Sequence, residues 1–124
     1  MAAFAGHDSV MENPVARSEL IKAVRHLSLS FDQQLEVVRG AHVDELALDF
    51  DGIYPAVKWR FAEVGVSPSA QLLLSSLNDR LLAMSGHAHA DLWTGNGLEF
   101  ANEWQVVRDI ATRVLAELAL EESP

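Results

Sequence analysis

Cysteine is absent from this sequence of 124 residues, which excludes disulfide bonds and thiolate metal sites. A lack of cysteine fits a reducing compartment, so we expect a cytoplasmic protein. No run of about 20 apolar residues occurs, so no membrane span is predicted. The first ten residues also lack the basic cluster and the apolar run of a secretory signal. The length fits one domain with its own hydrophobic core.

Basic residues are scarce: nine Lys and Arg stand against 18 Asp and Glu, which gives a formal net charge of −9. Because this charge repels phosphate groups, binding to DNA or RNA is not expected. The same charge would attract a basic protein, although acidic residues often serve only to keep a surface hydrated. A hydrophobic fraction of 49% is too high for a disordered chain, so we expect a folded, soluble protein.

Catalytic motifs are missing as well. There is no Gly-x-Ser-x-Gly elbow of a serine hydrolase, and the glycine-containing segment 94–97 lacks the lysine of a phosphate-binding loop. There is also no Glu-x-x-His pair, which carboxylate metal sites in helical bundles commonly use. We therefore predict no catalytic residue, no bound metal and no cofactor, and we interpret the protein as a non-enzyme.

Apolar residues recur at helical spacing in four segments. The first begins at Asn13 and Pro14, a capping residue and a residue tolerated in a first turn, and ends before Gly40. Serines at 28 and 30 could divide it, but the continuous apolar stripe favours one helix with a kink. The second covers residues 43–64, where Gly52 and Pro55 predict a kink or a break near positions 51–52.

The third segment begins with Ser67 as the cap, and we expect Gly86 to close it. Residues 86–101 are predicted to be irregular, with a turn or two of helix. The last helix is expected to open with Asn102 and Gln105 as a capping box and to bury Trp104. These patterns predict an all-α protein, an irregular four- to five-helix bundle in a single domain over 1–124, with flexible ends at 1–12 and 120–124.

The most suggestive polar segment runs from His42 to Asp51. On a helix Glu45 and Asp49 share one face, whereas Asp44 and Asp51 point elsewhere. Two such carboxylates can hold a divalent cation or act as an acid and a base. The interpretation that we favour is an acidic ridge, formed by these four side chains, that faces solvent or a partner.

Two histidines and two tryptophans are further candidates. His87 and His89 alternate and, with Asp91, could chelate zinc or nickel, but the set is incomplete, and a plain loop is favoured. Trp59 lies off the apolar stripe of its helix and is expected to be partly exposed. Trp93 follows the irregular segment and either locks it to the core or, like Trp59, anchors a partner.

The Asp-Glu-Leu-Ala-Leu-Asp-Phe-Asp segment at 44–51 is followed by Met-Ser-Gly at 84–86, Leu-Trp-Thr at 92–94 and Glu-Trp at 103–104. This combination is similar to small acidic helical bacterial proteins, some of which resemble immunity proteins of contact-dependent or polymorphic toxin systems. The resemblance implies a cytosolic inhibitor that covers the active site of a basic toxin domain. It also implies that Asp44, Glu45, Asp49 and Asp51 supply the charge and that Trp93 belongs to the contacting loop.

Three functional hypotheses remain open at this point. The first is a non-catalytic binding protein, monomeric or homodimeric, that occludes a protein partner. The second is a metal-dependent enzyme that uses Glu45 and Asp49 with a histidine. The third is a structural or self-associating helical module, which an exposed apolar stripe on the second helix would favour.

Overall fold

The structure, a computed structural model, describes residues 12–39 and 41–122. This part of the chain contains seven α-helices and one 3-10 helix and has no strand, so the all-α prediction is confirmed. The predicted count of four to five helices was too low. The helices are α2 (Asn13–Ser28), α3 (Phe31–Val38), α4 (Glu45–Val57), α5 (Phe61–Val64), α6 (Pro68–Ala83), η1 (His87–Trp93), α7 (Gly95–Phe100) and α8 (Asn102–Glu122).

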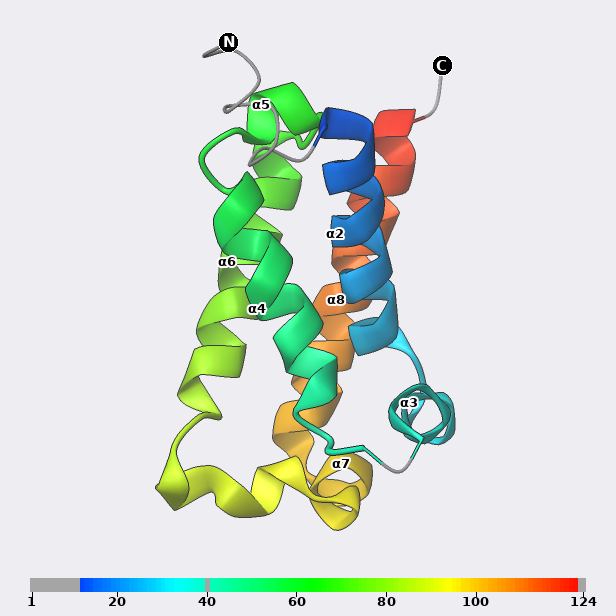
Figure 1. Cartoon of the computed structure of the whole chain (residues 1–124), viewed down its shortest axis with the longest axis vertical. Coiled ribbons are helices and arrows are strands. Elements are labelled where there is room, and N and C mark those ends of the chain that lie inside the picture. Colours follow the sequence, from blue (N-terminus) through cyan, green and yellow to red (C-terminus); the bar gives the residue numbers. More distant parts are fainter. Residues whose placement is uncertain (1–11, 40, 123–124) are drawn as a thin grey trace, which may run out of the picture.

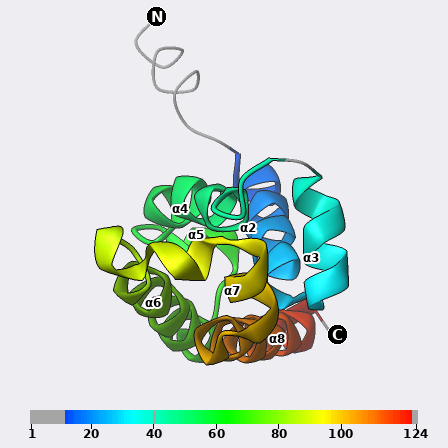
Figure 2. The ribbon, with the colours of Figure 1, turned by 90° about the horizontal axis from the view of Figure 1, so that it is seen from below.

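The four longest helices, α2, α4, α6 and α8, form an up-and-down bundle (Figure 1). The closest backbone contacts join α2 to α8, α6 to α8 and α2 to α4, whereas α4 and α6 approach each other least closely around the ring. The short helices cover the ends: α5 lies at one end, and α3, η1 and α7 lie at the other (Figures 1 and 2). One side of the bundle is therefore more open than the other three.

The first predicted helix is two helices, so the prediction of one kinked helix was wrong. The backbone is extended at Leu29 and Ser30. The Ser30 hydroxyl accepts a hydrogen bond from the Gln33 amide at 3.4 Å, and the Gln33 side chain accepts one from the Ser30 amide at 3.3 Å. This reciprocal capping box begins α3 in a new direction. The predicted closing residue, Gly40, lies outside the described residues. Helix α3 ends at Val38, and Arg39 follows as its C-cap in the left-handed region.

The predicted cap of the first helix was also wrong. Glu12 occupies the N-cap position of α2, and Asn13 is the first helical residue. The Asn13 side-chain oxygen instead accepts a hydrogen bond from Arg60 Nη1 at 2.7 Å, which joins the start of α2 to the α4–α5 connection.

The second predicted helix divides after Val57 rather than near positions 51–52. Helix α4 runs without interruption through Gly52 and Pro55. Pro55 has no amide hydrogen to donate to the Asp51 carbonyl oxygen, yet the helix continues for two more residues to Val57. The division falls at residues 58–60, after which α5 forms a single turn that ends at Val64. Gly65 follows as its C-cap in the left-handed region.

The third predicted helix begins as expected: the Ser67 hydroxyl accepts a hydrogen bond from the Ala70 amide at 3.3 Å. It ends at Ala83, before Gly86, which has a φ of 102° and precedes η1. Residues 86–101 are more regular than predicted, since η1 and α7 take up most of them. Gly97 is required at their junction, because a Cβ atom there would lie 2.3 Å from the Asp91 carbonyl oxygen.

The last helix begins at Asn102, and Trp104 is fully buried as expected. The predicted capping box is not formed by Gln105, whose amide group donates to Asp109 at 3.0 Å and whose oxygen accepts from Arg108. Of the predicted flexible ends, residues 1–11 and 123–124 lie outside the described residues, and α8 continues to Glu122. None of the described helices is long and apolar enough to cross a membrane.

A buried polar network fastens α8 to α3. Arg108 Nε donates to the Gln34 oxygen at 3.0 Å, and Gln34 Nε2 donates to the carbonyl oxygens of His26 and Leu27 at 3.2 Å each. Arg108 also donates to the Leu98 carbonyl oxygen. Burial lowers the pKa of Arg108, and the nearby Asp109 charge partly opposes this shift. Because an arginine stays protonated at physiological pH, these neutral acceptors hold a buried positive charge.

Candidate functional site

Helix α4 and its N-cap residue, Asp44, present the four carboxylates that the sequence singled out. Its apolar residues recur at helical spacing and turn toward the core, where Leu46, Phe50, Ile53, Tyr54 and Val57 are buried. Geometry then leaves the intervening positions on the outside. The acidic side chains are all exposed: Asp44, Glu45, Asp49 and Asp51. Asp44, Glu45 and Asp51 form no ion pair within the described part of the chain, so their charges face solvent.

The four carboxylates do not form one ridge. Glu45 and Asp49, one turn apart, lie on the side of α4 that faces α2, where Asp49 borders a shallow hollow together with Glu19 and Lys22. Asp44 and Asp51, two turns apart, lie on the other side and border a groove between α4 and α6. The predicted separation of the two pairs therefore places them on opposite flanks of the helix, with Leu48 between them.

The groove between α4 and α6 has a volume of ≈ 320 Å³. It follows the open side of the bundle, where the two helices approach each other least closely. Buried Phe50 and Leu81 contribute to its lining, and the exposed side chains of Leu48 and Leu82 contribute from α4 and α6 respectively. Its lining residues are Asp44, Ala47, Leu48, Phe50, Asp51, Asn78, Leu81, Leu82, Ser85, Gly86 and Trp93. The groove thus combines an apolar centre with two carboxylates from one wall.

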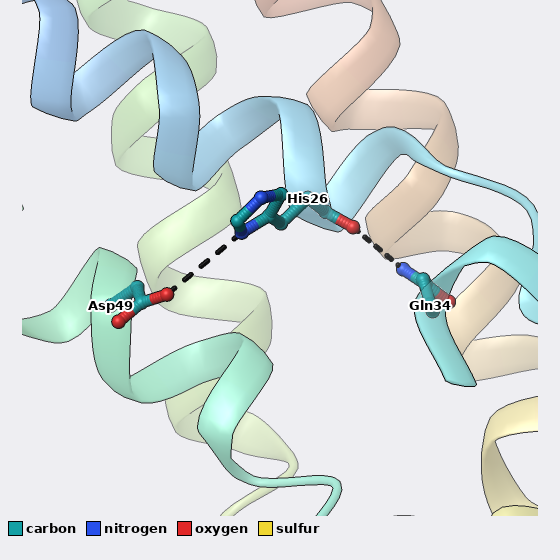
Figure 3. A network of polar contacts seen from close by, with 3 residues as sticks. All are labelled: His26, Gln34 and Asp49. Carbon is teal, nitrogen blue, oxygen red and sulfur yellow. Dashed lines mark hydrogen bonds and ion pairs between the residues drawn. The ribbon is translucent and has the colours of Figure 1, made fainter. Parts of the chain in front are cut away.

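Asp49 has a histidine beside it (Figure 3). The distance from His26 Nδ1 to Asp49 Oδ2 is 3.8 Å, which is close enough for electrostatic attraction but too long for a hydrogen bond. His26 Nδ1 is buried and has no hydrogen-bond partner among the described residues. On the other side, the His26 carbonyl oxygen accepts from Gln34, which fixes the end of α2 against α3. The Asp49 carboxylate itself remains 59% exposed.

The two candidate tryptophans lie in different surroundings. Trp59 follows α4 and is 84% exposed, with Lys58 Nζ 5.1 Å from its ring centroid. Trp93 is half-buried: its Nε1 donates to the Met84 carbonyl oxygen at 2.7 Å, and its ring meets the Trp104 ring edge-on at 5.3 Å. Trp104 in turn donates to the Leu92 carbonyl oxygen at 2.6 Å. Trp93 therefore locks the η1 segment to the core while it also borders the groove.

The six predicted partner-binding residues consequently do not form one patch. Trp93 lies with Asp44 and Asp51 at the groove. Trp59 lies beyond the other end of α4, about 22 Å from Asp44 and about 12 Å from Asp51 along the helix axis, because each helical residue advances about 1.5 Å. The role of these residues in binding stays a prediction.

The candidate metal ligands are not brought together. His87, His89 and Asp91 are exposed on η1. No group of three or more His, Asp or Glu side chains with the spacing of a metal site exists within residues 12–39 and 41–122. His26 lies 3.8 Å from Asp49, and no third His, Asp or Glu joins them in a metal-site group within the described residues.

Sequence reasoning missed the wall that α6 contributes to the groove, above all Leu82, Asn78 and Ser85. One signal was present. Leu48 and Leu82 are large apolar residues that lie off the buried stripes of their own helices, and such residues mark a surface that is only partly covered. Their meeting across one groove depends on the packing of α4 against the rest of the bundle, which local spacing does not contain.

Fold and surface together define a class: an all-α bundle with an acidic, partly apolar groove along one open side. No family model matches this chain, and no curated protein and no solved structure is significantly similar to it.

Proposed function

We propose that this protein is a non-catalytic binding protein that engages a basic protein partner through the acidic surface of α4. The observation that carries the proposal is the state of that surface: three of its four carboxylates are exposed without an ion-pair partner in the described structure, and the fourth is more than half exposed. Unpaired exposed carboxylates at a net charge of −9 attract a cationic surface.

The partner that we propose is a toxin domain with a basic active-site surface, which the protein neutralises in the cytoplasm as an immunity-type inhibitor. Inhibition of this kind needs no turnover, because the bound inhibitor blocks access to the toxin active site. Electrostatic attraction accelerates such encounters by about 10- to 1,000-fold at low ionic strength. Speed of capture matters for an inhibitor that must act before the toxin damages its substrate.

Two features favour binding over the other hypotheses. On the α2 side of α4, His26 lies beside Asp49, but no group of three His, Asp or Glu side chains is placed to hold a metal in the described part of the chain. Leu48 is the one large apolar side chain exposed on α4, so this helix has no apolar stripe for self-association.

A charge-neutralising variant tests the proposal. We expect Asp44→Asn, Glu45→Gln, Asp49→Asn and Asp51→Asn combined to slow association with a basic probe protein of net positive charge by at least about tenfold at low salt. The difference should shrink as salt screens the charges. Stopped-flow or surface-plasmon measurements over a range of ionic strength give the association rate constant.

The matched control neutralises four exposed acids away from α4, namely Glu36, Glu63, Asp79 and Glu99, and so changes the net charge equally. We expect this control to bind faster than the α4 variant. Equal association rate constants for the unmodified protein and the α4 variant would contradict the proposal. If the α4 variant and the control lose the same association rate, net charge alone attracts the partner, and the surface of α4 has no special role.

A further inference from the structure

The groove between α4 and α6 has a shape and a charge pattern that fit one kind of occupant. We propose that it receives a single basic amphipathic helix of the partner protein. This inference rests on the proposed function, since it names the part of a basic partner that the acidic surface recognises. It adds a prediction that acidity alone does not make: the two flanks of α4 contribute unequally.

The backbones of α4 and α6 leave one side of the bundle open. Around the ring of long helices, three neighbouring pairs are in close contact, and the α4–α6 pair is the most separated. The groove lies along this separation. Helices that dock into such grooves insert apolar side chains at positions i+3 and i+4 between the two walls of the groove. A docked helix would cover the open side of the bundle.

The groove has an apolar centre formed by leucines from both walls. Leu48 and Leu82 are 51% and 60% exposed, and they line the groove from opposite walls over buried Phe50 and Leu81. Exposed leucines on facing walls lose their contact with water when an apolar side chain enters between them. Ser85 and Asn78 provide polar groups on the α6 side.

The negative charges at the groove are spaced to match the positive charges of a cationic helix. Asp44 and Asp51 border the groove, seven residues apart, which is two helical turns or about 10 Å along α4. A partner helix that lies along the groove matches this separation with Lys or Arg at positions i and i+7. Its apolar residues at i+3 and i+4 then fall between the cations, opposite Leu48. No Lys or Arg is among the groove-lining residues, so nothing there repels a cationic helix.

The test uses a designed helical peptide as the probe, with Lys at positions i and i+7 and Leu at i+3 and i+4. A second peptide of identical composition has its lysines moved off the leucine face. Fluorescence anisotropy with the full-length protein is expected to show at least about tenfold tighter binding of the first peptide, because 1.4 kcal/mol of additional contact corresponds to a tenfold change in affinity.

Two double variants carry the decisive comparison, since they change the net charge equally and lie on the same helix. We expect Asp44→Asn with Asp51→Asn to weaken binding of the first peptide by about tenfold. We expect Glu45→Gln with Asp49→Asn to weaken binding of the same peptide only about twofold to threefold, because these two carboxylates lie on the α2 side of the helix and attract the peptide from a distance. All four side chains are exposed, and thermal unfolding of each variant verifies that it is folded.

A second comparison tests the apolar centre without altering charge. Leu82→Ser should weaken peptide binding by about fivefold or more, because it removes one apolar wall. Leu72→Ser, on the same helix and 73% exposed but outside the groove, should leave binding unchanged.

The outcomes separate the two proposals. Equal losses in both charge variants would overturn the groove while leaving a basic partner for α4 as a whole. If neither charge variant weakens peptide binding, both the groove and the acidic binding surface of α4 are overturned. Equal binding of the two peptides would overturn the helical register. A dimer of the unliganded protein in sedimentation that Leu82→Ser dissociates would place a second copy in the groove, and this also would overturn the proposal.

Discussion

Glycine residues show how differently single positions are constrained in this fold. Gly52 lies on the exposed side of α4, and a Cβ atom added there would meet no atom within 4 Å. Gly97 lies in α7, where an added Cβ atom would come within 2.3 Å of the Asp91 carbonyl oxygen and 2.7 Å of the Leu92 carbonyl oxygen. The first glycine is therefore replaceable, whereas the second allows η1 and α7 to approach closely.

We expect Gly52→Ala to raise the free energy of unfolding by about 0.5–1 kcal/mol, because alanine restricts the unfolded chain and favours a helix. Gly97→Ala should lower it by about 1–3 kcal/mol, because backbone atoms must move apart. Urea denaturation of both variants measures the two changes, and shifts of the same sign would contradict this account.

At the scale of elements, the boundaries between helices are set by short-range capping. The capping box of Ser30 and Gln33 separates α3 from α2 and begins α3 in a new direction. The new direction places Gln34 where it can accept from Arg108. A local cap therefore determines a tertiary contact between residues 74 positions apart.

Removal of this cap should cost stability. We expect Ser30→Ala to lower the free energy of unfolding by about 1 kcal/mol, since the hydroxyl that accepts from the Gln33 amide and donates to the Gln33 side chain is lost. The control is Ser76→Ala, an exposed position within α6, which should change it by less than about 0.5 kcal/mol. Chemical denaturation followed by circular dichroism measures both, and a neutral Ser30→Ala would show that tertiary packing alone begins α3.

At the scale of the whole molecule, the two candidate tryptophans lie near opposite ends of α4, one in solvent and one against the core. This difference separates binding from stability. Loss of Trp93 removes a hydrogen bond to Met84 and an edge-on contact with Trp104, whereas Trp59 contacts mainly Lys58.

We expect Trp59→Ala to change the free energy of unfolding by less than about 0.5 kcal/mol. Trp93→Ala should lower it by about 2–3 kcal/mol, because a partly buried ring and its hydrogen bond are lost. Thermal unfolding measures the stability, and acrylamide should quench the fluorescence of Trp59 more strongly than that of the other two tryptophans. A strong destabilisation by Trp59→Ala would show that this ring is covered.

The sequence by itself determined the helical class, the buried face of each long helix and the cap at Ser67. These features depend on residues within one or two turns of each other, so local periodicity contains them. It misplaced the break in the second helix because α4 tolerates the loss of one backbone hydrogen bond at Pro55 and continues to Val57.

Only the tertiary structure decided that Asp44 and Asp51 share a groove with Leu82 and Trp93, and that Trp59 lies far from them. The physical reason is that a groove is formed by side chains from helices distant in sequence. Its width depends on how α4 packs against α2 and how α6 packs against α8, and local sequence patterns do not predict that distance.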